Sequence, residues 1–195
     1  MAGRAGRGLV GVIAAGVAVA AVAAGCSSTV DGRATEEGSV PTSVDTSLPL
    51  FNPCTDLSDE VLSGDNLDPS TKRVSVDSRD EGVEAWWKIC NWDSTEGPYG
   101  VSVFSTRRTV PERRANPESL FVRDMMVGDR AGIVTTKRES NPLYDLTCYV
   151  SFPAAHGMFE IGVSWMHSER DMLVESPPCG IAVEHAIYFE KNLPD

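Results

Sequence analysis

The chain has 195 residues, which allows one domain of ordinary size once an N-terminal export segment and a polar stretch are set aside. Its formal net charge of −11 would repel nucleic acid and anionic lipid headgroups, so nucleic-acid binding is excluded. The composition is 42% hydrophobic, but the Ala and Val residues near the N-terminus raise that figure. The remaining chain is therefore more polar than this figure suggests, and such a composition argues against a large internal lipid cavity.

Residues 1–25 have the features of a bacterial signal peptide. Arg4 and Arg7 form a basic segment, and the stretch Leu9–Ala24 that follows carries no charge. A membrane-spanning helix would need about 20 apolar residues, and this stretch is shorter and rich in Ala and Gly. We therefore expect export and cleavage rather than a transmembrane helix.

The end of this segment resembles a lipobox, the site where bacteria attach diacylglycerol to a cysteine and cut the chain before it. Ala23-Ala24-Gly25 precede Cys26, although Leu is usual three positions before the cysteine, and residues 21–23 also suit an ordinary signal peptidase. The chain has 5 cysteines, and an odd number leaves one thiol over in an exported protein. We therefore expect Cys26 to carry a lipid anchor that holds the protein on the extracytoplasmic side of the cell membrane.

Residues 26–49 lack the hydrophobic residues that a core needs. They are rich in Ser, Thr, Gly, Asp and Glu and contain no aromatic residue, so we expect a flexible tether after the lipidated cysteine. A chain of this length and composition has an r.m.s. reach of about 25 to 30 Å. The folded domain is expected over residues 50–195.

The pattern of the domain predicts an α+β fold. Strict alternation over residues 146–152 and 159–165 indicates a sheet with one buried face. Pro117 as a first helical residue and Gly128 as a stop predict a helix between them. The expected order is α-βββ-α-βββ-α, a single domain with a mainly antiparallel sheet, helices packed on one face and a partly polar second face. The predicted helices cover 58–63, with Ser58 as N-cap, 116–128 and 176–193, and the predicted strands cover 73–77, 86–92, 100–106, 133–137, 146–152 and 159–165.

Without Cys26, the remaining four cysteines allow three disulfide pairings. The local pairing joins Cys54 to Cys90 and Cys148 to Cys179. It closes loops of moderate length and ties the flanking element of each half to its sheet. We favour this pairing, and the two alternatives stay open at this point.

Several short motifs in a fixed order resemble one family of bacterial proteins. They run from the lipobox and tether through Phe51-Asn52-Pro53-Cys54, Cys90-Asn91-Trp92, Cys148 and Pro178-Cys179 to Leu193-Pro194. Over roughly residues 51–194 this pattern resembles the actinobacterial lipoproteins of domain-of-unknown-function family 3558, in which Asp is common in place of Asn52. The resemblance implies a cell-envelope lipoprotein of a mycobacterium or a relative. It implies no reaction, because the family has no assigned activity.

The chemically active residues form no recognisable catalytic or metal-binding motif. His156, His167 and His185 fall on a turn, a strand end and a helix, where we expect surface or half-buried side chains rather than metal ligands. The sequence has no Gly-x-Ser-x-Gly elbow and no glycine-rich phosphate loop. Acidic pairs such as Asp80-Glu81 are expected to be solvated loop charges. We therefore expect a protein that is not an enzyme and that uses no cofactor or metal.

Aromatic residues are the stronger functional signal. Trp86 and Trp87 are neighbours on a predicted strand and so face opposite sides, which allows one of them to lie on the open face with Tyr149. The expected function is a non-catalytic binding module of the cell envelope for a protein, a glycan or a small amphiphilic ligand, with these three residues as candidates for contact. The alternative is an envelope hydrolase that acts on cell-wall or lipid material through an unrecognised site. A lipid carrier would need a deep apolar cavity.

Overall fold

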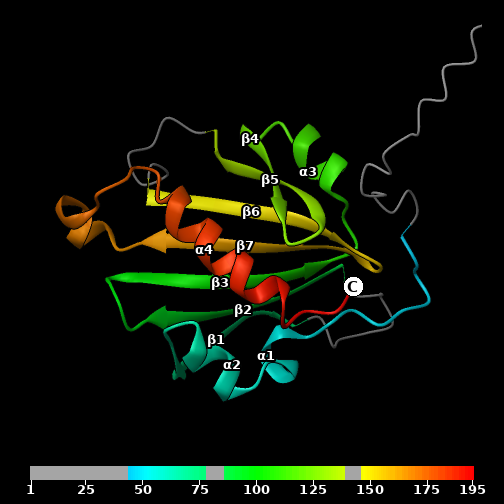
Figure 1. Ribbon diagram of the computed structural model, residues 1–195, viewed down its shortest axis with the longest axis horizontal. Helices are drawn as coiled ribbons and strands as arrows, with labels where there is room; N and C mark the ends of the chain where they lie inside the picture. The colour runs from blue at the N-terminus through cyan, green and yellow to red at the C-terminus, as the bar shows by residue number, and fades with distance from the viewer. Residues whose placement is uncertain (1–43, 78–85, 139–145) are drawn as a thin grey trace, which may run out of the picture. The chain divides into compact units, whose positions relative to one another are not determined.

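In the computed structural model, which describes residues 44–77, 86–138 and 146–195, a seven-stranded antiparallel sheet forms the middle of the domain (Figure 1). The predicted α+β class and the antiparallel sheet are confirmed. The strand order across the sheet is β1-β2-β3-β7-β6-β5-β4. The strands are β1 (Leu67–Asp77), β2 (Trp87–Ser94), β3 (Tyr99–Thr106), β4 (Ser119–Val127), β5 (Arg130–Lys137), β6 (Thr147–Ala154) and β7 (Gly157–Trp165).

Two runs of sequential hairpins make up the sheet. β1 to β3 form one run, β4 to β7 form the other, and β3 pairs with β7 where the runs meet. Val101 lies opposite Val163 and Val103 opposite Ile161, so the apolar positions of both runs point to the same face. Because side chains alternate along each strand, the residues between them point to the other face. The junction thus creates one continuous core face and a second, more polar face, which we call the open face although most of its residues on β7 are buried.

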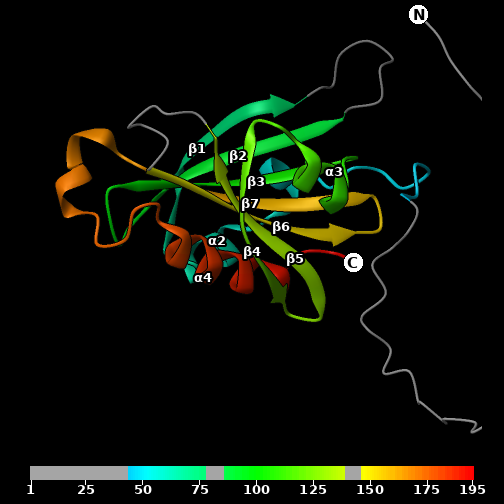
Figure 2. The same ribbon diagram turned by 90° about the horizontal axis from the view of Figure 1, so that it is seen from above.

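Helices cover the two faces unequally. α1 (Pro53–Asp56), α2 (Asp59–Gly64) and α4 (Cys179–Glu190) pack on the face that carries the main core. The short helix α3 (Val110–Ala115) packs on the opposite face, and Figure 2 shows α3 and α4 on opposite sides of the sheet. The position of α3 departs from the expectation that all helices share one face. A 3-10 helix, η2 (His167–Met172), follows β7.

The helix predicted between residues 116 and 128 is wrong. This segment forms the edge strand β4, and the helix lies earlier, at α3, where Thr109 and Glu112 form a capping box. Gly128, which predicted a helix end, has a φ of 58° and begins the two-residue turn between β4 and β5. Apolar side chains of β4 lie on both faces of this edge strand and stay largely exposed, so their spacing imitates a helical period.

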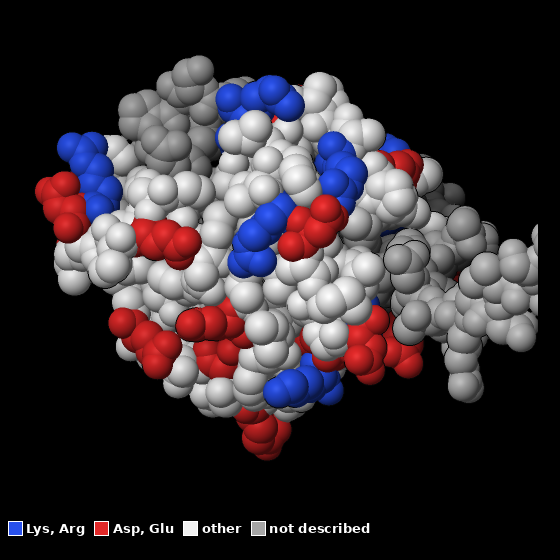
Figure 3. Space-filling view, turned by 45° about the horizontal axis from the view of Figure 1, so that its top comes forward, with Lys and Arg blue, Asp and Glu red and all other residues white. Residues whose placement is uncertain are grey.

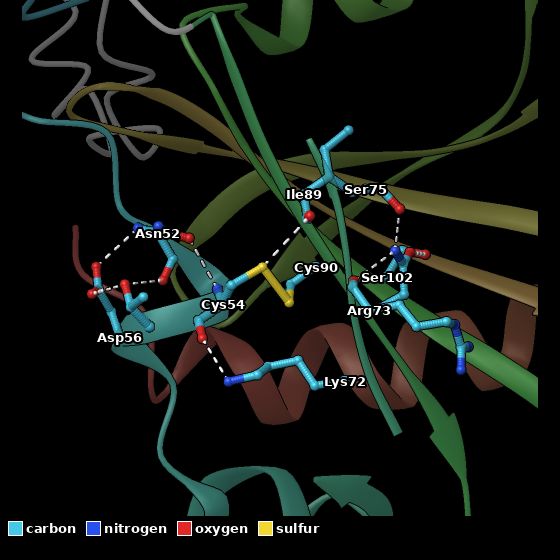
Figure 4. Close-up of a disulfide and its surroundings, with 11 residues drawn as sticks. Asn52, Cys54, Asp56, Lys72, Arg73, Ser75, Ile89, Cys90 and Ser102 are labelled. Carbon is cyan, nitrogen blue, oxygen red and sulfur yellow. Dashed lines mark hydrogen bonds between the residues drawn. A yellow bond between two sulfur atoms is a disulfide. The ribbon is translucent and has the colours of Figure 1, made fainter. Parts of the chain in front are cut away.

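Both disulfides of the local pairing are present, which confirms that choice. Cys54–Cys90 joins α1 to β2, and Cys148–Cys179 joins β6 to the start of α4. Figure 4 shows the first bridge, where the N–H of Cys54 donates to the Asn52 side chain at 3.1 Å and so caps α1. Each bridge therefore fastens a helix to the core face of the sheet.

Contacts with the domain begin before residue 50, the predicted start of the folded part. The N–H of Asp45 donates to the Ala155 carbonyl at 2.9 Å, Arg107 donates to the Asp45 carbonyl at 3.2 Å, and Leu50 is buried. The last residues assigned to the tether thus contact the hairpin that joins β6 to β7. The predicted signal peptide, Cys26 and the tether up to residue 43 lie outside the described residues. Among the helices that the structure describes, none is long and apolar enough to cross a membrane.

Candidate ligand groove

The open face of the sheet is hollowed beside α3. Trp87 and Ile89 of β2, Phe104 of β3 and Met158 of β7 supply an apolar lining, and polar residues of α3 form one wall. The hollow has a volume of about 630 Å³. That volume lies within the range of known small-molecule sites, about 300 to 1,000 Å³.

A second hollow of about 420 Å³ continues the first toward β6, where Tyr149 lines it. The two hollows share Phe104, Arg113, Asn116 and Glu160, so we treat them as one feature, the α3 groove. The groove crosses β2, β3, β7 and β6, which are neighbours in the sheet. Three strand spacings correspond to a length of about 14 Å.

An aromatic row lies along the α3 groove. The Trp87 and Phe104 rings meet edge to face with centroids 6.3 Å apart, and the Phe104 and Tyr149 rings do so at 6.2 Å. β7 lies between the strands of Phe104 and Tyr149, and Gly162 is the residue of β7 at this point. A Cβ atom at Gly162 would lie 2.9 Å from two ring carbons of Tyr149 and 3.2 Å from one of Phe104. The row is continuous because Gly162 has no side chain.

A buried ion pair connects α3 to the sheet. Arg113 Nε lies 2.5 Å from Glu160 Oε2, and their side chains are 14% and 4% exposed. The Ser151 hydroxyl donates to the same carboxylate oxygen at 2.6 Å, and Arg113 also donates to the Ser119 hydroxyl. The Arg113 guanidinium lies 5.3 Å from the centroid of the Tyr149 ring. These contacts hold two charged groups in place in the lining of the groove, so a ligand would meet a pre-organised polar site.

The rim of the groove is charged but balanced. Arg108 and Glu112 form an exposed pair at 3.2 Å, and the Arg108 guanidinium also lies 5.1 Å from the centroid of the Trp86 ring. Among the described residues, the charged groups that line the groove are three cations, Arg108, Arg113 and Lys137, and three carboxylates, Glu112, Glu118 and Glu160. The lining therefore has no net charge, although the whole chain has a net charge of −11.

Figure 3 shows how charged side chains are distributed over one face of the molecule. Lys and Arg side chains are scattered over this face, and acidic side chains prevail over its lower half. Among the described residues on this face, there is thus no continuous basic surface of the kind that binds nucleic acid.

The structure separates the three predicted contact residues. Trp87 and Tyr149 both line the α3 groove, with Phe104 between them. Trp86 precedes β2, is 52% exposed and lies outside the groove lining. Sequence reasoning missed Phe104, which alternates with buried valines on β3, and Glu160, which alternates with apolar residues on β7. Glu160, a single carboxylate at the centre of a largely apolar strand, was a signal in the sequence that could have indicated a buried ion pair. Its cationic partner, Arg113, could not be identified from the sequence of the strand alone.

Two of the three histidines are buried, which corrects the expectation of surface or half-buried side chains. His156 Nε2 lies 2.9 Å from Ser105 Oγ. Burial keeps the charged imidazolium out of water and, with repulsion from Arg107 and Arg130, lowers the pKa of His156 to about 4. His156 is therefore neutral near pH 7.

The second buried histidine, His185 of α4, links three elements of the core face. Its Nδ1 lies 2.8 Å from Asp65 Oδ2, and its Nε2 lies 3.3 Å from the Tyr99 hydroxyl. Burial raises the pKa of Asp65, and the hydrogen bond to His185 opposes that effect. His167, in contrast, is exposed beside Arg170. In the part of the chain that the structure describes, no three His, Cys, Asp or Glu side chains converge as a metal site would require.

Together, the fold and the groove define a disulfide-bonded α+β domain with a ligand-sized hollow on its open sheet face. Residues 21–192 match the family described as "Protein of unknown function (DUF3558)", and the chain belongs to this family. The resemblance seen in the sequence is thus confirmed at the level of the family. Comparisons with curated proteins and with solved structures found no match.

Proposed function

We propose that this chain is a non-catalytic lipoprotein of an actinobacterial cell envelope, and that its domain binds a ligand in the α3 groove. The observation that supports the binding function best is the groove itself. It combines an aromatic row with the largely buried Arg113–Glu160 ion pair in a hollow of about 630 Å³. Ligand sites in proteins commonly pair an apolar lining with a few fixed polar groups.

The proposed location in the cell envelope rests on the sequence and on the disulfides. The two bridges use four of the 5 cysteines, so Cys26 alone has no intramolecular partner among the cysteines. Lipidation of Cys26 after a signal peptide would account for the fifth cysteine. A lipid anchor on the extracytoplasmic side of the membrane would then place the α3 groove in the cell envelope.

One observation favours the alternative, an envelope hydrolase. Ser105 and His156 are in hydrogen-bond contact, as a nucleophile and its base would be. However, Ser105 is completely buried and lines neither hollow of the α3 groove, nor a third hollow, of about 340 Å³, that His156 does line. A histidine with a pKa of about 4 is also a weak base at neutral pH. We therefore interpret the Ser105–His156 contact as structural.

The binding function can be tested by NMR on the mature protein with Cys26→Ser. Fractions of cell-envelope extract would be added while the indole N–H signals of the 4 tryptophans are followed. We expect the signal of Trp87 to move, and the signal of Trp92, which is fully buried on the core face, to stay in place. If no fraction moves the Trp87 signal, the proposal fails. If a fraction is instead hydrolysed, and His156→Ala abolishes that turnover, the hydrolase is correct.

A further inference from the structure

We propose that the ligand of the α3 groove is a neutral oligosaccharide of several sugar rings, an inference that rests on the proposed binding function of the same groove. The shape of the groove is the first argument. It is an elongated hollow that crosses four adjacent strands over about 14 Å, from Trp87 on β2 to Tyr149 on β6. An extended ligand can contact this whole length, whereas a single sugar ring can contact only part of it.

The charge of the lining is the second argument. Three cationic and three carboxylate side chains line the groove, and two pairs among them are already formed, Arg113 with Glu160 and Arg108 with Glu112. An anion or a cation would therefore meet a lining of zero net charge and, at either of these two pairs, would compete with an existing partner. Hydroxyl groups instead both donate and accept hydrogen bonds, so they can bind to Arg N–H groups and to carboxylate oxygens without breaking the pairs.

The mixed polarity of the groove argues against an acyl chain. Trp87, Phe104 and Tyr149 line the groove, and aromatic side chains can pack against the C–H faces of sugar rings. A hydrocarbon chain over the same length would cover Asn116 and the charged rim without forming any hydrogen bond, and burying polar groups in that way is unfavourable. A polyhydroxylated ring satisfies both parts of the lining.

The direction of the groove argues against a peptide. Peptides that extend a sheet pair with a free strand edge, but the α3 groove crosses β3, β7 and β6, whose backbones are paired on both sides. Proline-rich peptides do bind aromatic grooves, but proline lacks an N–H. Such a peptide would offer few donors to the carboxylates of Glu112, Glu118 and Glu160. A proline-rich ligand is therefore the main competing outcome of the test.

The test uses the mature protein with Cys26→Ser and isothermal titration calorimetry. The probes are an array of neutral tetrasaccharides that includes chitotetraose, cellotetraose and maltotetraose, the matching monosaccharides, laurate, and a ten-residue proline peptide. We expect at least one tetrasaccharide to bind at millimolar concentration or better, and its monosaccharide to bind much more weakly. Trp87→Ala should weaken binding about tenfold or more, as the loss of a central aromatic contact often does.

Two further variants locate the site. Ile187→Ala is the control, because Ile187 is exposed on α4, on the other face of the sheet, and this variant should bind with an affinity near that of the parent. Arg108→Gln, at an exposed position on the rim, should weaken binding without unfolding the domain and serves if Trp87→Ala does not fold.

Several results would overturn the inference. If only laurate or the proline peptide binds, and Trp87→Ala abolishes that binding, the ligand class is wrong and the groove remains a binding site. If a tetrasaccharide binds equally well to the parent, Trp87→Ala and Arg108→Gln, the site is wrong. If no probe binds in calorimetry and no envelope fraction moves the NMR signal of Trp87, the proposed function fails together with this inference.

Discussion

Phe104 and Tyr149 lie on strands that are not neighbours, yet their rings meet edge to face at 6.2 Å because Gly162 occupies the strand between them. This contact is what makes the aromatic row continuous. It also gives Gly162, in the middle of a strand, a specific structural role, because the absence of a side chain there leaves room for the two rings.

Gly162→Ala should therefore lower the free energy of unfolding by about 1 to 3 kcal/mol, because the new methyl group must displace two aromatic rings. Gly100→Ala is the matched control: Gly100 lies on the adjacent strand β3, and its nearest contact for a Cβ atom is 3.4 Å, an ordinary distance. Urea denaturation of both variants measures the difference. Equal stability of the two variants would contradict the proposed role of Gly162.

Glu160→Gln should cost about 3 to 5 kcal/mol, because it leaves the largely buried Arg113 guanidinium without its counter-charge. Asp93→Asn is the control. It removes a carboxylate from an ion pair with Arg73 whose side chains are 54% and 33% exposed, and it should cost less than about 1 kcal/mol. A double-mutant cycle with Arg113→Met should then show strong coupling to Glu160. Additive effects would mean that the two groups do not act as a pair.

His156 should make the domain acid-sensitive. Its pKa is about 4 in the folded state, below the ordinary value of 6.5, so the unfolded chain takes up a proton first as the pH falls. The stability that neutral His156 contributes is complete above about pH 6.5 and is lost as the pH falls toward 4. A difference of one in pKa between the folded and the unfolded chain corresponds to about 1.4 kcal/mol of stability. The contribution of His156 is therefore about 3 kcal/mol in all.

Chemical denaturation at pH 7, 6, 5 and 4 would measure this loss for the parent and for His156→Gln, which cannot gain a proton in this range. We expect a shallower decline in the variant, and an unchanged decline in His167→Ala, because His167 is exposed. Identical slopes for the parent and His156→Gln would show that His156 is not the titrating group.

Changing Cys26 to Ser should release the protein from membranes and leave the domain folded, because the polar residues that follow Cys26 lack the hydrophobic side chains that a core needs. Carbonate washing of membranes, followed by detection of the protein in pellet and supernatant, measures the release, and circular dichroism checks the fold. A Cys26→Ser protein that stays in the washed pellet would rule out the lipid anchor.

Replacing both cysteines of either disulfide with alanine should lower stability by about 2 to 4 kcal/mol, because each bridge restricts the unfolded chain and fixes a helix to the sheet. Thermal unfolding of the two double variants measures the loss. Loss of the Cys148–Cys179 bridge should in addition loosen the start of α4, which hydrogen exchange would detect. Wild-type stability in both variants would contradict this account.

Local patterns in the sequence determined much of the fold. Strands β6 and β7, Ser58 as the N-cap of α2 and the local cysteine pairing all appear in the structure, because each depends on residues that are close in the sequence or on a simple period. Burial itself does not alternate along β7, where residues 157–163 are buried on both faces. Local signals also misled: Pro117 and Gly128 fit the ends of a helix, yet the segment between them pairs with β5 as an edge strand. Strand pairing, which local propensity does not contain, decided that outcome.

The α3 groove, in contrast, was decided only by the tertiary structure. The sequence identified Trp87 and Tyr149 as candidates but could not show that β3 and β7 lie between them, because strand order depends on long-range pairing. It could not match Arg113 to Glu160 either, since 47 positions separate them and α3 was predicted elsewhere. Periodicity tells which face of a strand is buried, but only the order of strands in space tells which side chains share the open face.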